Sequence, residues 1–233
     1  MTQFGSTLGI VAPVLQICLI DLLLGGDNAL VIAMACRGLP ARLWRRVVWL
    51  GTGAAVLLRI ALTALAAAIL SIPFLKLIGA VLLLAIAVKL LAKPPHGQPE
   101  QDGARPQHDA WTAFTTIIVA DTVMSLDNVL AVAAAARGNF WLLAFGLALS
   151  VPIVIFGSVA VARMLDRYPP LIVAGGALLG WVAGDTAISD PAISTWVERQ
   201  RFEVVAAAPV IGALYVLIHA RLARRCGWSR KPR

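Results

Sequence analysis

Two segments of the sequence carry the same acidic pattern, an aspartate followed six residues later by an Asp-Asn pair. Segments 21–38 and 121–138 align without a gap at an offset of 100 residues. The polar residues that they share are Asp21 and Asp121, Asp27 and Asp127, Asn28 and Asn128, and Arg37 and Arg137. Carboxylate and carboxamide oxygens are the ligands that Mg²⁺, Ca²⁺ and Mn²⁺ prefer. The pattern predicts a site for a hard divalent cation, and zinc and copper fit poorly because no His or Cys belongs to the repeated pattern.

These acids stand in a very apolar chain. Of its 233 residues, 60% are hydrophobic and only 14% are charged, against roughly 25% charged in a soluble domain. This composition excludes a soluble globular protein and indicates a membrane protein. An ionisable side chain near the bilayer centre costs at least about 2.5 kcal/mol, so such groups ordinarily face a partner, a cavity or an ion path. Four aspartates and one arginine, Arg59, leave an excess of negative charge that bound cations or protons must offset.

Apolar stretches of about 20 residues, the length that spans a bilayer as a helix, recur along the chain. The predicted spans are 8–35, 43–71, 73–92, 111–135, 139–162, 169–186 and 203–222. We therefore expect an all-α fold, a polytopic membrane helical bundle that forms a single transmembrane domain over residues 1–233. Segment 93–110 is rich in Pro, Gln and Gly and is predicted to be a linker.

Basic residues gather on one side of the predicted membrane. Fifteen Lys and Arg residues fall in the connectors of one side and four in those of the other. By the positive-inside rule, the N-terminus lies outside and the C-terminus and linker 93–110 lie in the cytoplasm. The same connectors explain the net charge of +8, so no nucleic-acid partner is expected.

Each acidic segment opens a group of three spans, so the second group must enter the membrane from the opposite side. This predicts a 3+3 inverted repeat, with repeat 1 at about 8–92, repeat 2 at about 111–186 and a seventh helix at about 203–222 appended. Inverted repeats commonly place substrate sites near the bilayer midplane, where helices are often interrupted.

The spacing from the nearest connector agrees with a midplane site. Asp27 lies ten residues, roughly 15 Å of helix, before Arg37, and the second copy has the same spacing. Two consecutive glycines, Gly25 and Gly26, could break the first helix, whereas Ser125 and Leu126 stand at these positions in the second copy. The sequence does not decide whether both helices stay intact.

Three further residues near the pattern could contribute to the site. Met124 lies three residues from each aspartate of the second copy, so its thioether could favour Mn²⁺ or could simply pack the helix interface. Arg59 lies near the middle of the second span and is expected to pair with one of the aspartates, without indication of which. Asp185, near the outer end of the sixth span, could be a vestibule ligand or a surface anion.

Several segments resemble the TerC family of bacterial membrane proteins, and within it the YjbE branch. They are 24–33, 51–59, 72–79, 86–91, 118–128 and 181–185, and the likeness spans roughly residues 10–190. The resemblance implies a polytopic bacterial inner-membrane metal-ion transporter, with manganese efflux as the leading function and an older association with tellurite resistance. Carried over by motif, the ion site would comprise Asp21, Asp27, Asn28, Asp121, Asp127 and Asn128.

Two functions remain open from the sequence. The first is a transporter that exports a hard divalent cation, with Mn²⁺ favoured and Ca²⁺ or Mg²⁺ as alternatives, in exchange for protons. The second is a non-transporting stress-response scaffold whose buried acids are structural. An enzyme is not expected, because an intramembrane aspartyl protease would carry a glycine signature before its aspartates and only the first acidic segment has glycines there. The chain also lacks a P-loop signature, which argues against a self-contained ATP-driven pump. No covalent cofactor is expected; the partners would be the cation and the bilayer, and the oligomeric state is undecided.

Overall fold

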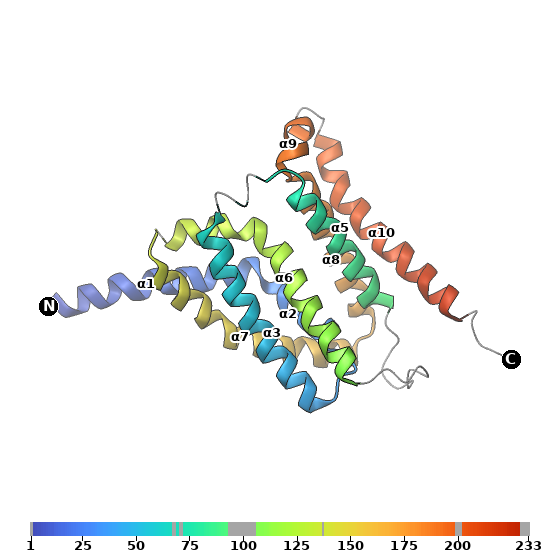
Figure 1. Ribbon diagram of the computed structural model, residues 1–233, viewed down its shortest axis with the longest axis horizontal. Helices are drawn as coiled ribbons and strands as arrows, with labels where there is room; N and C mark the ends of the chain where they lie inside the picture. The colour runs from blue at the N-terminus through green and yellow to red at the C-terminus, as the bar shows by residue number, and fades with distance from the viewer. Residues whose placement is uncertain are drawn as a thin grey trace.

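The computed structural model describes residues 2–66, 69, 72–92, 106–136, 138–198 and 202–228 (Figure 1). These residues form helices joined by short turns and contain no strand. The helices are α1 (Thr2–Leu24), α2 (Gly26–Ala35), α3 (Ala41–Ala64), α5 (Leu75–Ala92), α6 (Pro106–Ala136), α7 (Phe140–Arg167), α8 (Pro170–Ile188), α9 (Pro191–Glu198) and α10 (Phe202–Trp228).

The predicted membrane bundle is confirmed. Among the described residues, six helices are long and apolar enough to cross a membrane, and α1 and α2 together make a seventh span with a bend of 54°. Large apolar side chains such as Leu23 and Phe156 are 82% and 74% exposed, as expected for surfaces that face lipid. Helix α6 begins at Pro106, inside the segment predicted as a linker, and residues 93–105 lie outside the described part of the chain.

The first and second spans pack across the two repeats. The broken span α1–α2 packs against α7, and its counterpart α6 packs against α3. Gly51 of α3 lies against Ile117, and Gly146 of α7 lies against Ile17. Glycines at equivalent positions of the two repeats therefore pack against isoleucines at equivalent positions. The third helices α5 and α8 pack against each other. This exchange is what an inverted repeat predicts, and it brings both acidic segments to the middle of the bundle.

The seventh span, α10, packs along the outside of α8 and α5 (Figure 1). Gly180 of α8 and Gly212 of α10 bring the two backbones into direct contact, since a Cβ built on Gly212 would overlap the Gly180 carbonyl oxygen. Small residues commonly permit such close packing of membrane helices. Helix α10 therefore covers the third helices and leaves the acidic segments to the first six spans.

The break in the first span lies at Gly25, between α1 and α2. A Cβ on Gly25 would lie 2.7 Å from the Asp21 carbonyl oxygen and 2.8 Å from the Asn28 amide nitrogen, so only glycine fits there. The Asn128 side chain of α6 donates a hydrogen bond of 3.1 Å to the Leu24 carbonyl, which ends α1. Helix α6 continues through Ser125 without a break. Of the two possibilities left open by the sequence, the structure has a break in the first copy only.

Candidate functional site

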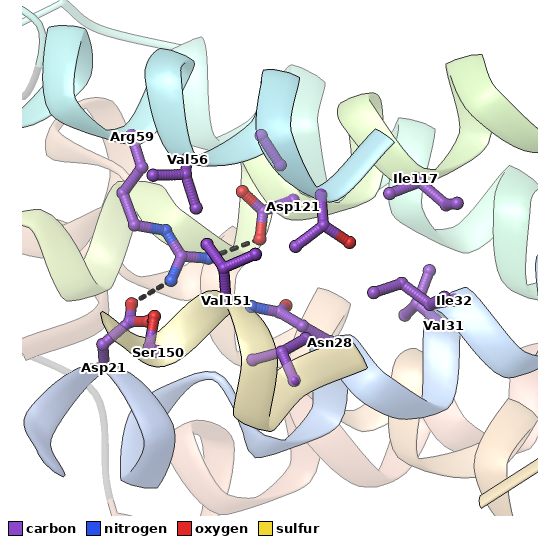
Figure 2. Close-up of a pocket in the computed structure, with 13 residues that line it drawn as sticks. Asp21, Asn28, Val31, Ile32, Val56, Arg59, Ile117, Asp121, Ser150 and Val151 are labelled. Carbon is purple, nitrogen blue, oxygen red and sulfur yellow. Dashed lines mark hydrogen bonds and ion pairs between the residues drawn. The ribbon is translucent and has the colours of Figure 1, made fainter. Parts of the chain in front are cut away.

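The centre of the bundle holds one arginine between two aspartates (Figure 2). Arg59 reaches from α3 and forms ion pairs with Asp21 of α1 and Asp121 of α6. All three residues are buried, at 5%, 4% and 8% exposed. The sequence predicted that Arg59 pairs with one aspartate; the structure pairs it with both first aspartates of the repeated pattern.

Two hydroxyl groups complete this ionic cluster. Arg59 Nε donates to Ser125 Oγ at 2.9 Å, and Ser125 Oγ lies 3.3 Å from the Asp121 carboxylate, to which it donates. The Ser150 hydroxyl of α7 donates to the other oxygen of Asp21. Buried charges are tolerated when they are paired and hydrogen-bonded in this way. The cluster thus joins α1, α3, α6 and α7.

A cavity of about 20 Å³ adjoins the cluster, enough for one water molecule or one small ion. Its polar lining consists of Asp21, Asn28, Thr52, Arg59, Asp121 and Ser150, and the rest is valine, isoleucine and alanine. Figure 2 shows the labelled side chains converging from helices of both repeats. Asn28 Oδ1 and Thr52 Oγ1 are buried and have no hydrogen-bond partner. These two groups of the cavity lining could therefore bind a water molecule or an ion.

The second aspartates of the pattern lie apart from this cavity. Asp27 is in the first turn of α2, is partly buried, and has one carboxylate oxygen, Oδ1, that is buried without a hydrogen-bond partner. Asp127 of α6 forms an ion pair with Lys76 of α5, and its side chain is 36% exposed. Within the described ranges, no three His, Cys, Asp or Glu side chains are grouped to hold a metal ion. The structure thus joins Asp21 with Asp121 but not all four aspartates.

The remaining predicted residues have distinct environments. Asn128 holds the end of α1 through the Leu24 carbonyl and is not part of the cavity lining. Met124 is 5% exposed and packs in the main hydrophobic core, as the packing interpretation proposed. Asp185 of α8 is exposed, which agrees with a surface anion.

Lys76 is one of the four basic residues that the sequence places in the connectors of one side, and it was not predicted to belong to the site. Its ammonium group binds Asp127 and also lies 3.3 Å from the Ser189 hydroxyl. Thr186 Oγ1 approaches the second Asp127 oxygen at 3.4 Å. Residues near the ends of α5 and α8 therefore contact Asp127 of the second acidic segment.

Asp190 was missed as well, although it precedes Pro191, a pattern typical of a helix start. It is fully buried and accepts backbone N–H groups of Phe74 at 2.9 Å, Leu77 at 3.1 Å and Ala192 at 2.8 Å. Burial acts to raise the pKa of Asp190, but these N–H donors outweigh it and lower the pKa below its ordinary value. Because its donors flank Lys76, Asp190 fixes the turn that presents Lys76 to Asp127.

Comparison with known proteins identifies the family. Residues 6–226 match the family described as the integral membrane protein TerC family. The chain is 40% identical to the uncharacterized membrane protein YjbE of Bacillus subtilis (strain 168) over 199 residues. The aligned region covers 85% of this chain and 89% of that protein. No solved structure matches the chain. With its helical bundle, the chain is an integral multi-pass membrane protein, and it belongs to the TerC family.

Proposed function

We propose that this protein is a bacterial inner-membrane transporter that exports a hard divalent metal cation, with Mn²⁺ as the leading substrate, in exchange for protons. The observation that carries the proposal is the small cavity between the two repeats, lined by Asp21 and Asp121 and adjoining the break in the first span. Transporters with inverted repeats bind their substrates in this kind of place. A cavity of about 20 Å³ suits an inorganic ion and not an organic solute, and carboxylate, amide and hydroxyl groups form the polar part of its lining.

The charge balance supports a divalent guest. The repeated pattern contributes four carboxylates, and the structure gives them two basic partners, Arg59 and Lys76. With all four acids ionised, two negative charges remain, which is what one divalent cation neutralises. Protons can neutralise the same carboxylates when the cation leaves, and this supports exchange of a metal ion for protons.

The basic side chains would act as internal substitutes for the cation. Arg59 occupies the space between Asp21 and Asp121, so a metal ion that binds both carboxylates must displace its guanidinium group. Asp27, with an oxygen that lacks a hydrogen-bond partner, lies six residues along the chain from Asp21 and would be the first acid reached from one side. Asp127 would be the last acid before release on the opposite side.

The donor atoms suit Mn²⁺, Mg²⁺ and Ca²⁺ alike, because they are carboxylate, amide and hydroxyl oxygens. Met124 packs in the core and not in the cavity lining, so its sulfur gives no preference for Mn²⁺. The choice of Mn²⁺ rests on the family resemblance. The distribution of basic residues supports an orientation with the N-terminus outside and the C-terminus in the cytoplasm.

A scaffold without transport activity is the second candidate, favoured by one observation. Arg59 already satisfies Asp21 and Asp121, as a purely structural network would. Against this candidate stands the cavity beside the network, whose lining has two buried polar atoms without partners.

The proposal is tested with the purified protein in liposomes. We expect Mn²⁺ flux above that of protein-free liposomes, and we expect Asp21→Asn and Asp121→Asn to abolish it. Asp185→Asn is the matched control, because Asp185 is exposed on α8 and lies outside the cavity lining. Absence of flux in the wild type for Mn²⁺, Mg²⁺ and Ca²⁺ favours the scaffold, whereas full flux after both cavity aspartates are neutralised would show that the cavity is not the ion site.

A further inference from the structure

Thr52 has a hydroxyl group that the structure leaves without a partner. It lies on α3, is 5% exposed, and lines the central cavity. A threonine inside a helix usually donates its hydroxyl proton to the carbonyl one turn earlier. Thr63, also buried on α3, does so with the Arg59 carbonyl at 2.7 Å, and Thr122 of α6 does so with Ile118 at 2.6 Å. Thr52 makes no such bond and its Oγ1 has no partner, so this hydroxyl is free to bind a guest.

Asn28 presents a second neutral oxygen to the same cavity. It lies on α2, just after the helix break, and is 6% exposed with Oδ1 unpartnered. Figure 2 shows the Asn28 side chain extending towards the space between Asp121 and Val151. A buried polar atom without a partner is unfavourable. Two such atoms on the lining of one small cavity indicate that the cavity binds a ligand.

The chemistry of the lining restricts that ligand. The Asn28 carbonyl oxygen only accepts hydrogen bonds, so the guest must be a proton donor or a cation. Two carboxylates line the same cavity and favour a cation. The volume of about 20 Å³ admits one ion without its full hydration shell. An ordered water molecule is the competing guest.

We infer that Thr52 and Asn28 supply two neutral oxygen ligands to the transported cation. This inference rests on the proposed function. Hard divalent cations take about six oxygen ligands or more, and neutral oxygens raise that number without burying a further charge in the bundle. Loss of the Thr52 hydroxyl would remove one ligand from an ion that has lost part of its hydration shell, and would therefore weaken its binding.

The test combines two readouts on the purified full-length protein. Thr52→Val keeps the shape of the side chain and removes only the hydroxyl. Without added metal, we expect its thermal midpoint to equal or exceed that of the wild type, since no hydrogen bond is lost. We expect at least a tenfold higher Mn²⁺ concentration for half of the metal-induced rise in midpoint. Thr52→Ser, which retains a hydroxyl, is expected to restore the response.

Thr63→Val is the matched control. It removes a buried hydroxyl from the same helix, but one that is bonded to the Arg59 carbonyl, so we expect a lower midpoint without metal and an unchanged Mn²⁺ response. If Thr52→Val lowers the midpoint and leaves the response intact, the cavity holds structural water and the inference is wrong. If Asp21→Asn abolishes the response while Thr52→Val preserves it, only the inference fails. A wild type that does not respond to Mn²⁺, Mg²⁺ or Ca²⁺ overturns both proposals.

Discussion

The two copies of the acidic pattern share their polar residues but use them differently. In the first copy the helix is broken at Gly25, and Asp27 keeps an oxygen without a partner. In the second copy the helix is continuous, and Asp127 is bound to Lys76. The repeat therefore supplies two equivalent sets of polar side chains. The second aspartate has a carboxylate oxygen without a partner in the first copy and is ion-paired with a lysine in the second copy.

The break explains why the two asparagines differ. Asn128 donates to the Leu24 carbonyl, which the break at Gly25 leaves without a partner inside α1. Helix α6 has no corresponding break, so Asn28 has no such helix end to bind. Its oxygen is left to the cavity instead.

A single arginine, Arg59, pairs with the first aspartates of both copies. Gly51 and Gly146 are equivalent through their contacts with Ile117 and Ile17, and the same offset of 95 residues pairs Arg59 with a valine. The cavity-lining pairs on this offset are Ala55 and Ser150, Val56 and Val151, and Arg59 and Val154. The second repeat thus has no base of its own at the centre, which leaves the net negative charge that the proposed function requires.

Removal of the shared arginine should have the largest effect. Arg59→Met leaves Asp21 and Asp121 buried without a counterion, and breaking a buried ion pair from one side costs about 3–5 kcal/mol. We expect a large fall in the thermal midpoint at neutral pH. Combining Arg59→Met with Asp21→Asn should recover part of the loss, because one buried charge is then removed. An unchanged midpoint in Arg59→Met would show that the two acids have partners other than the arginine.

The helix break offers a matched pair of substitutions. Gly25→Ala places a Cβ 2.7 Å from the Asp21 carbonyl oxygen and should cost about 1–3 kcal/mol. Gly26→Ala meets open space and should be neutral or stabilising by up to about 1 kcal/mol, because alanine favours a helix over glycine. Thermal unfolding of both variants measures the difference. Equal midpoints would mean that the break does not depend on Gly25.

Removal of the ion pair between Lys76 and Asp127 in the second copy should lower the stability by a smaller amount. Lys76→Met removes an ion pair whose Asp127 side chain is 36% exposed, so we expect a loss of about 1 kcal/mol or less. It should also make the second aspartates of the two copies alike in lacking a basic partner, and Mn²⁺ flux in liposomes should change. Lys89→Met, an exposed lysine at the other end of α5, is the control. Equal flux in both variants would argue against a role for Lys76 in release.

The smallest effect is expected at acid pH and concerns Asp190. Its folded pKa is lowered by backbone N–H donors, so its stabilisation is complete above the unfolded value of about 3.9 and is lost as the pH falls through the folded value. From pH 7 to pH 4, Asp190 should therefore contribute almost no change in stability. Below pH 4, the wild type should lose stability that Asp190→Asn has already lost. Parallel acid titrations of both proteins would contradict this assignment.

The sequence predicted the features that depend on local composition and spacing. Hydropathy defined the spans, and the offset of 100 residues predicted the inverted repeat. The spacing placed Asp27 and Asp127 at the midplane site, whereas the structure places Asp21 and Asp121 in the lining of the central cavity. The sequence also predicted an ion pair for Arg59, since a lone base among acids in a membrane needs a partner. The contacts of Lys76, Asp190 and Thr52 were out of reach, because they depend on which face each helix turns to a neighbour that is distant in the chain. The helix break was suggested by Gly25-Gly26, but the side chain that binds the Leu24 carbonyl at the break, Asn128, belongs to the other repeat.

The exchange of helices between the repeats has a consequence for how the protein can be built. Because the opening span of each half is covered by the other half, neither half can bury its own acidic helix, and the halves must reach the bilayer together to be stable. Cutting the polypeptide between residues 93 and 105 would leave two fragments that complete each other, whereas either fragment expressed alone would expose charged groups to lipid and be a target for degradation.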